Sequence, residues 1–244
     1  MTGQGEKAIV YKGILFDLDN TLLDYDRSEE IAMREALAEH GLDPDNASFW
    51  KQFRHHFIRC NTVYWLERFE RKLHISKVLE LSFRDAFAEL KLDGYEASSL
   101  AESYWRHFCR LFVPEEGAQE VIAQLHGAYK LAIVSNGIGE AQRQRLAAGR
   151  MEHYFEALVV SDEAGCAKPD PRIFHAALER FGLKPHEVLF VGDSLRDDYA
   201  GAVRSGIDFC LYNRRRSPLG DEHRPAYSIE RLCELPGLLQ SRER

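Results

Sequence analysis

The sequence has no long apolar run and no excess of basic residues. None of its apolar stretches approaches the roughly 18 uncharged residues that a membrane-spanning helix needs, so no membrane partner is expected. The formal net charge is -7, which argues against a polymeric nucleic acid partner, because such partners favour basic grooves. Residues 1–7 are polar and lack the apolar core of a signal peptide, so the expected location is cytoplasmic.

Cysteine is scarce, and its spacing follows no known pairing pattern. The five cysteines lie far apart and form no C-x-x-C pair. Reduced thiols therefore fit better than a disulfide framework or a zinc site. The remaining composition, with 45% apolar and 29% charged residues, is that of a folded globular protein.

Short apolar runs alternate with helical stretches over much of the chain. Each run ends in small or acidic residues; the runs are 14–16 (preceded by apolar residues in 8–11), 130–134, 157–160 and 188–191. Helical stretches are expected at 139–148, 171–181 and 195–205. This alternation predicts an α/β fold, a Rossmann-like doubly wound parallel sheet covered by helices on both faces. A last strand near 226–229 and a short helix are expected after it.

The stretch 27–112 has a different pattern, without a convincing strand. Leu79, Phe83, Phe87 and Leu90 recur at helical spacing, and breaks fall at 41–44 and 93–94. We expect an all-helical cap domain at 25–112, inserted into an α/β core domain formed by 1–24 and 113–244. An insertion directly after the first strand is placed to close over a site there as a lid.

Two aspartates, Asp17 and Asp19, follow the first apolar run. Residues two apart at the end of a strand point the same way, so both carboxylates can face one ligand. Adjacent carboxylates repel each other unless a cation or a proton intervenes, and Mg²⁺ prefers such oxygen ligands. Asp193, which follows another predicted strand, supplies a third acidic group.

Candidate phosphate ligands follow the other strands. Lys168, in Lys168-Pro169, adds a positive charge, and Ser135 with the backbone N–H groups of Asn136 and Gly137 offers donors to phosphate oxygens. Each motif taken alone is ordinary turn chemistry. All of them at the carboxyl ends of successive strands are harder to explain as turns, because ligands bind at that edge of parallel sheets.

The motifs resemble those of the haloacid dehalogenase-like (HAD) hydrolase superfamily, in the branch with a helical cap. The resemblance covers about residues 9–213, and the matching segments in order are Asp17-Leu18-Asp19-Asn20-Thr21, Ser135-Asn136, Lys168-Pro169 and Gly192-Asp193-Ser194-Leu195-Arg196-Asp197-Asp198. The cap matches in type more than in sequence.

The resemblance implies a role for each motif residue. Asp17 would attack phosphorus and form an aspartyl-phosphate, while Asp19 would protonate the leaving oxygen and later take a proton from water. Mg²⁺ would bind the Asp17 carboxylate, the Asp19 backbone carbonyl and Asp193. Phosphoryl oxygens would be held by Lys168, Ser135 and the Asn136 amide, with Gly137 beside them. Supporting roles fall to Thr21 and to Asp198, the second acidic position of the last motif; Asp197 stands where many relatives carry another polar residue.

Asp19 favours phosphate esters, because dehalogenases of the superfamily lack an acid there. The resemblance therefore implies an Mg²⁺-dependent phosphatase for a small phosphorylated metabolite. The second motif of the chain has the form Ser135-Asn136-Gly137, which resembles that of the pyrimidine 5'-nucleotidase-like and sugar-phosphate phosphatases. A nucleoside 5'-monophosphate is therefore the first candidate substrate. The alternatives are a sugar phosphate, a phosphomutase, or an idle relative that serves as a binding partner, against which the complete set of motif residues argues.

Substrate contacts are expected in the cap. Asn61, Tyr64, Trp65 and Arg71 form a polar-aromatic patch along one predicted helix, although Trp65 and Phe69 fit better as cap core. The pair His55 and His56 is interpreted as a solvated helix face. The basic run 214–216 is expected to be a surface loop and not a ligand clamp.

Overall fold

A parallel sheet of six strands forms the centre of the α/β part. The computed structural model describes residues 11–240, so Ala8–Val10 of the first apolar run lie outside it. The strand order is β3-β2-β1-β4-β5-β6, and every neighbouring pair is parallel. The strands are β1 (Gly13–Phe16), β2 (Lys130–Ser135), β3 (Ala157–Val160), β4 (Val188–Gly192), β5 (Asp208–Tyr212) and β6 (Tyr227–Ile229).

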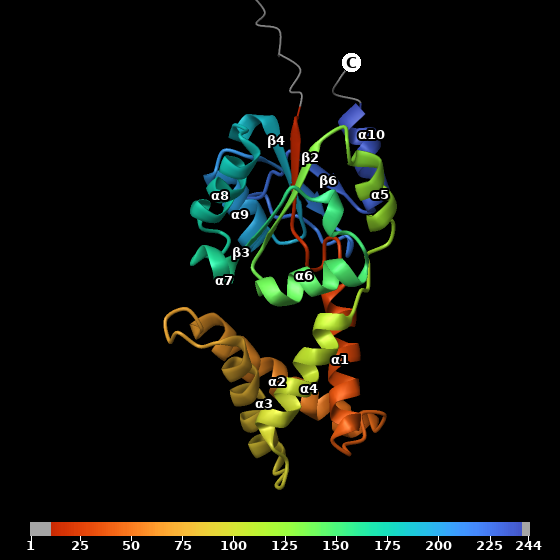
Figure 1. Cartoon of the computed structure of the whole chain (residues 1–244), viewed down its shortest axis with the longest axis vertical. Helices are drawn as coiled ribbons and strands as arrows, with labels where there is room; N and C mark the ends of the chain where they lie inside the picture. The colour runs from red at the N-terminus through yellow and green to blue at the C-terminus, as the bar shows by residue number, and fades with distance from the viewer. Residues whose placement is uncertain (1–10, 241–244) are drawn as a thin grey trace, which may run out of the picture. The chain divides into compact units, whose positions relative to one another are not determined.

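Both faces of the sheet are apolar because alternate side chains point to opposite faces. Ile14 and Phe16 of β1 belong to one buried cluster together with residues of α5 (Ala118–Leu125) and α10 (Leu235–Gln240). Leu15, between them, belongs to a second cluster with residues of α8 (Pro171–Phe181) and α9 (Ala200–Arg204). Figure 1 shows these two helix pairs on opposite sides of the sheet. The prediction of a doubly wound α/β sheet is confirmed.

Short helical segments lie between the strands and, in the case of η4, after the last one. They are α6 (Gly139–Ala148), η1 (Glu152–Tyr154), α7 (Ser161–Ala164), η2 (Pro185–Glu187), η3 (Leu195–Tyr199) and η4 (Leu232–Glu234). Helices α6 and α8 have the bounds expected from the sequence. The single helix expected at 195–205 is instead the π-helical turn η3 followed by α9, since the N–H groups of Asp198 and Tyr199 both donate to the Ser194 carbonyl at 3.0 Å.

Strand β5 is the one that the sequence patterns did not predict. Its residues, Asp-Phe-Cys-Leu-Tyr, include an acid and no β-branched side chain, so the local preference for a strand is weak. Pairing with β4 and β6 on either side supplies the stabilisation instead.

Helices make up the second compact unit, Asp26–Leu111, while the first contains the sheet. The helices are α1 (Tyr25–Glu39), α2 (Ala47–Glu67), α3 (Ile75–Leu90) and α4 (Ala97–Arg110). The expected breaks at 41–44 and 93–94 fall between helices; a further break at 68–74 was not expected. The unit has its own aromatic core, in which Phe53 is fully buried and stacks on Phe57 and Phe83. Within residues 11–240, no helix combines the length and the apolar character needed to cross a membrane.

Candidate active site

The candidate site lies where the strand order reverses beside β1. β2 and β4 flank β1, and such a switch point is where parallel sheets bind ligands, at the carboxyl ends of the strands. Asp17 follows β1 directly, Asp193 follows β4, and Ser135 is the last residue of β2. Parallel registration of β1 with both neighbours therefore brings these three residues to one edge of the sheet.

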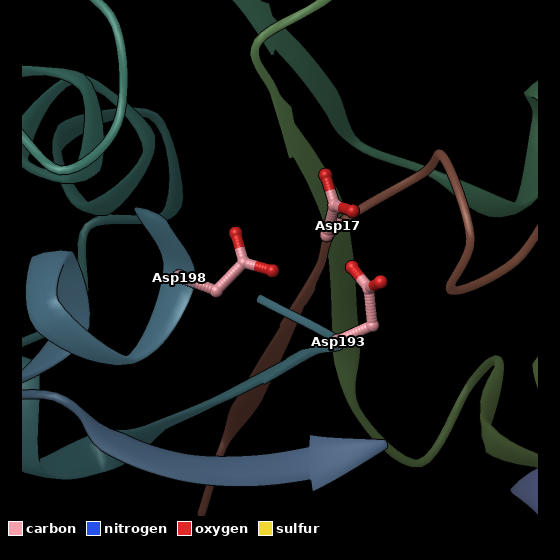
Figure 2. Close-up of side chains that lie close together, drawn as sticks. All are labelled: Asp17, Asp193 and Asp198. Carbon is pink, nitrogen blue, oxygen red and sulfur yellow. The ribbon is translucent and has the colours of Figure 1, made fainter. Parts of the chain in front are cut away.

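Three carboxylates gather at this edge. Oxygen atoms of Asp17, Asp193 and Asp198 lie within 4.8 Å of one another, the only such acidic, histidine or cysteine group among the described residues (Figure 2). Asp198 reaches the cluster from η3. It approaches Gly192 so closely that a Cβ on that glycine would lie 2.4 Å from Asp198 Oδ2, so only glycine fits there.

Lys168 provides the balancing positive charge. Its Nζ lies 2.6 Å from Asp17 Oδ1 and 2.7 Å from Asp198 Oδ1, and the residue is 5% exposed. Asn136 fixes the Lys168 backbone, because its Nδ2 donates to the Lys168 carbonyl at 3.0 Å and its Oδ1 accepts from the Lys168 N–H at 2.7 Å. The Asn136 side chain thus positions the lysine.

Burial and charge shift the pKa values of this cluster. Burial raises the pKa of Asp17 well above its usual range; Lys168 opposes this shift, and the other two carboxylates add to it. Burial, with the Asp198 carboxylate next, raises the pKa of Asp193 to about 7. Burial alone would lower the pKa of Lys168, but Asp17 and Asp198 raise it above its ordinary value.

The donor set fits a divalent cation. Three carboxylates face one ammonium group, so the cluster has an excess of negative charge that a hard cation would neutralise. Asp198 is already engaged through both oxygens, with Lys168 and with the Ser194 N–H at 3.1 Å. Asp17 and Asp193, the carboxylate ligands that the motif resemblance implies, stay the predicted pair, in keeping with the one or two carboxylates that Mg²⁺ prefers.

The phosphate-binding residues predicted at β2 form a tight turn. Ser135 Oγ accepts hydrogen bonds from the Gly137 N–H at 3.0 Å and from Gln142 Nε2 at 2.9 Å. Its own O–H proton is not used in either bond, and its role as a donor to a phosphoryl oxygen stays a prediction. The Gly137 N–H is engaged within the turn. Thr21 Oγ1 donates to Asp17 Oδ2 over 3.4 Å.

The Asp19 side chain stands apart from the acidic cluster. Arg145 Nη1 donates to its Oδ1 and Gln142 Nε2 to its Oδ2, each at 2.6 Å. The sequence patterns identified neither α6 residue, because both lie inside a helix without a motif. No signal in the sequence marks them, because the burial of Arg145 is visible only in the structure.

Arg214 corrects the expectation of a surface loop at 214–216. Only Arg215 and Arg216 are exposed. Arg214 forms an ion pair with Glu115 and donates to Asn20 Oδ1 at 2.9 Å. Asn20 has a left-handed backbone, with φ of 62°, so Arg214 stabilises the loop that follows Asp17.

The other acidic residues near the site have structural partners. Asp197 pairs with the exposed Arg196 at 3.2 Å and does not join the cluster. Asp162, in α7 just after β3, accepts from the Gly139 N–H at 3.1 Å and so caps α6.

Within the helical unit, the predicted substrate residues do not share one helix. Helix α2 ends at Glu67, so Arg71 lies in the turn beyond it, paired with Glu67 at 2.8 Å. Asn61 donates to Ser82 Oγ at 3.2 Å, and Tyr64 donates to Asp85. Their role in substrate binding stays a prediction.

Two aromatic residues of this patch differ in burial. Trp65 is half-buried under the Arg68 guanidinium, 3.6 Å from its ring centre. Phe69 is 41% exposed, so its assignment to the cap core is wrong. It lies beyond the end of α2, with the Arg68 guanidinium 4.2 Å from its ring centre.

Comparisons with known proteins agree with this geometry. Residues 11–206 match the haloacid dehalogenase-like hydrolase family. The HAD-hydrolase YfnB of Bacillus subtilis is 30% identical over 237 residues, which cover 94% of this chain and 95% of YfnB. A magnesium-bound crystal structure of YfnB matches with a TM-score of 0.79 at 28% identity, over 94% of this chain and 99% of that one.

Two further relatives have named activities. The pyrimidine 5'-nucleotidase PynA of Streptococcus pneumoniae is 27% identical over 221 residues, or 90% of this chain and 91% of PynA. The N-acylneuraminate-9-phosphatase of Rattus norvegicus is 27% identical over 249 aligned positions, or 94% of each chain. The chain therefore belongs to the haloacid dehalogenase-like hydrolase family and is one of its phosphatases.

Proposed function

We propose that the chain is an Mg²⁺-dependent phosphomonoesterase of the cytoplasm that acts through an aspartyl-phosphate on Asp17. The observation that carries the proposal is the buried contact of Asp17 with Lys168, 2.6 Å apart, inside a cluster of two further carboxylates. A nucleophilic carboxylate beside a fixed ammonium group suits attack on an anionic phosphoryl group.

The first half-reaction transfers the phosphoryl group to the enzyme. An oxygen of Asp17 attacks phosphorus, and the bond from phosphorus to the ester oxygen breaks. Asp19 gives its proton to the departing alkoxide. Lys168 and the Ser135 O–H stabilise the charge on the phosphoryl oxygens in flight.

The second half-reaction releases phosphate. Asp19, now ionised, takes a proton from a water molecule, whose oxygen attacks phosphorus. The bond from phosphorus to the Asp17 oxygen breaks, and inorganic phosphate leaves. Mg²⁺ held by Asp17 and Asp193 would supply electrostatic shielding between the anionic nucleophile and the phosphate.

We propose a nucleoside 5'-monophosphate as the first candidate substrate and a sugar phosphate as the second. The full-length similarity to a pyrimidine 5'-nucleotidase supports the former, and the full-length similarity to N-acylneuraminate-9-phosphatase supports the latter.

Phosphate release from a panel of nucleotides and sugar phosphates, with Mg²⁺ and after its removal, tests this proposal. The Asp17→Asn variant should show no turnover while remaining folded, because the amide is not a nucleophile. The Asp221→Asn variant, which changes an exposed carboxylate, is the matched control and should keep full activity. A folded, Mg²⁺-loaded wild type that hydrolyses none of the esters would contradict the phosphatase mechanism and favour a mutase or a binding partner.

A further inference from the structure

Helix α6 carries two buried polar side chains that the mechanism above leaves without a role. Arg145 is fully buried and Gln142 is 1% exposed. They lie three residues apart and hence on one helix face. Both reach the same carboxylate: Arg145 Nη1 lies 2.6 Å from Asp19 Oδ1, and Gln142 Nε2 lies 2.6 Å from Asp19 Oδ2. Each Asp19 oxygen therefore has its own donor.

The two donors are also connected to each other. Arg145 Nη1 donates to Gln142 Oε1 at 3.1 Å. Gln142 Nε2 donates in addition to Ser135 Oγ at 2.9 Å, so one amide group contacts both the proposed acid–base residue and the proposed phosphate ligand. A side chain at position 137 would exclude this arrangement, because its Cβ would lie 2.1 Å from Gln142 Nε2. Glycine at this position keeps the space open.

Burial of Arg145 has a cost that surface arginines avoid. A guanidinium group loses its hydration inside a protein, and arginine is almost never fully buried unless it is paired. The Asp19 side chain that it meets is 24% exposed, whereas that of Arg145 is 0% exposed. The arginine thus approaches the carboxylate from the protein interior and leaves the outer side of Asp19 open.

The helix itself is fixed in place. The Gly139 N–H at its start donates to both Asp162 oxygens, at 3.1 and 3.2 Å. Ser161 Oγ donates to the Asn136 carbonyl at 2.9 Å, which joins the same segment to the turn after β2. The two donors therefore stand on a rigid support, as precise orientation of a reacting group requires.

We infer that Gln142 and Arg145 are positioning residues that hold the Asp19 carboxylate in the orientation from which it exchanges a proton with the leaving oxygen and with water. The inference rests on the proposed phosphatase mechanism and adds these two residues to it. Orientation matters here because a proton is transferred only within hydrogen-bond reach of the oxygen that receives it.

The dependence of the rate on the leaving group tests the inference. Glycerol phosphate releases an alkoxide, which needs a proton, whereas dinitrophenyl phosphate releases a phenolate that leaves without one. We expect Arg145→Met and Gln142→Met to lower kcat/KM for glycerol phosphate by about tenfold or more, with little change for dinitrophenyl phosphate. Arg145→Lys should recover part of the loss, and Asp19→Asn should show the same selectivity in stronger form.

Helix α6 offers matched controls for both changes. Arg143 and Gln144 are exposed on the same helix, so Arg143→Met and Gln144→Met should leave both rates unchanged. The melting temperature and its increase with Mg²⁺ are measured for every variant to show that the site is intact. Gln142→Met removes no charge, so it decides the question even if Arg145→Met does not fold.

An equal loss for both esters in variants that keep the Mg²⁺ effect would overturn the inference and assign the residues a structural role. A gain for glycerol phosphate would also overturn it, since the two donors would then hold Asp19 away from the reaction. Wild-type protein that hydrolyses neither ester would contradict the proposed function itself, and this inference with it.

Discussion

Burial and charge act against each other on the residues of the acidic cluster. In the proposed mechanism Asp17 attacks phosphorus in its ionised form, yet burial and the neighbouring carboxylates raise its pKa, and Lys168 offsets only part of that shift. A divalent cation at the cluster would favour the ionised form of all three carboxylates. Repulsion among the three buried carboxylates destabilises the metal-free cluster, and the same repulsion favours the binding of a divalent cation.

Asp193 leads to a prediction of pH dependence. Its pKa in the folded, metal-free protein is about 7, against an ordinary value of 3.8. A raised carboxyl pKa means that the folded state binds the proton more tightly than the unfolded state does. Its stabilising contribution is thus present at low pH and is lost as the pH rises from the ordinary value through about 7. Mg²⁺ needs the ionised carboxylate, so its binding should strengthen over the same interval.

Thermal unfolding with and without Mg²⁺ measures this effect. The increase in melting temperature caused by Mg²⁺ should be larger at about pH 8 than at about pH 6. In Asp193→Asn the increase should be smaller and should differ less between the two pH values, since Asp17 is the only titrating carboxylate ligand left. An equal Mg²⁺ effect at both pH values in the wild type would contradict the prediction.

At the scale of elements, the segments after the strands divide into those that form the site and those that support it. Asp17, Ser135, Lys168 and Asp193 follow the predicted pattern of motifs and lie around the switch point of the sheet. Asp162, which follows β3 in the same way, caps α6. In the sequence, Asp162 and Asp193 look alike, since each is an acidic residue shortly after a strand. They differ in the sheet, because β4 lies beside β1 whereas β3 is an edge strand whose end lies away from β1.

The cap at Asp162 can be tested through its helix. Asp162→Ala removes the acceptor for the first N–H of α6 and should lower the stability by about 1 kcal/mol. Because α6 carries Gln142 and Arg145, the variant should also lose kcat/KM for glycerol phosphate. Asn46→Ala removes the N-cap of α2, which accepts from Ser48 and Phe49, and serves as the control. Asn46→Ala should lower the stability by a similar amount and leave kcat/KM for glycerol phosphate unchanged. If Asp162→Ala and Asn46→Ala have the same kcat/KM, α6 has no role in catalysis.

At the scale of the whole molecule, the chain forms two compact units with separate cores. The acidic cluster belongs entirely to the unit that contains the sheet, 1–25 and 112–244, while the aromatic core around Phe53 belongs to 26–111. The change in periodicity along the sequence predicted a helical domain at 25–112, and the structure gives 26–111. Helical and strand periods differ enough for such a boundary to be read without tertiary information.

Separate cores predict separate responses. Phe53 is fully buried among aromatic rings, so Phe53→Ala should destabilise the helical unit by about 3–5 kcal/mol. Calorimetry should show that the helical unit unfolds at a lower temperature in this variant. The increase in melting temperature that Mg²⁺ causes in the unit with the sheet should stay unchanged. A single transition whose Mg²⁺ effect falls with the mutation would contradict independent cores.

Asp17 and Asp193 were predictable because each directly follows a strand, where the sequence pattern changes abruptly. Lys168 was expected at a strand end but lies in the loop between α7 and α8, so its signal was the match of Lys168-Pro169 to a family motif. Gln142 and Arg145 carry no signal: they lie inside α6, a largely polar helix without a motif, and only the path of α6 brings them to Asp19. Arg214 likewise reads as part of a basic run until Glu115 and Asn20 are seen beside it.

The amino-acid sequence by itself determined the α/β fold, the helical insertion, the family and the reaction class, since these depend on local periodicity and on short motifs. The motif resemblance already assigned Asp17, Asp193 and Asp198 to one site, and only the tertiary structure decided that Arg145 and Gln142 of α6 hold the Asp19 side chain apart from this cluster. It also decided that Asn136 fixes Lys168. Such partners are far apart in the chain, and their contacts follow from strand order and helix placement, which local sequence does not encode.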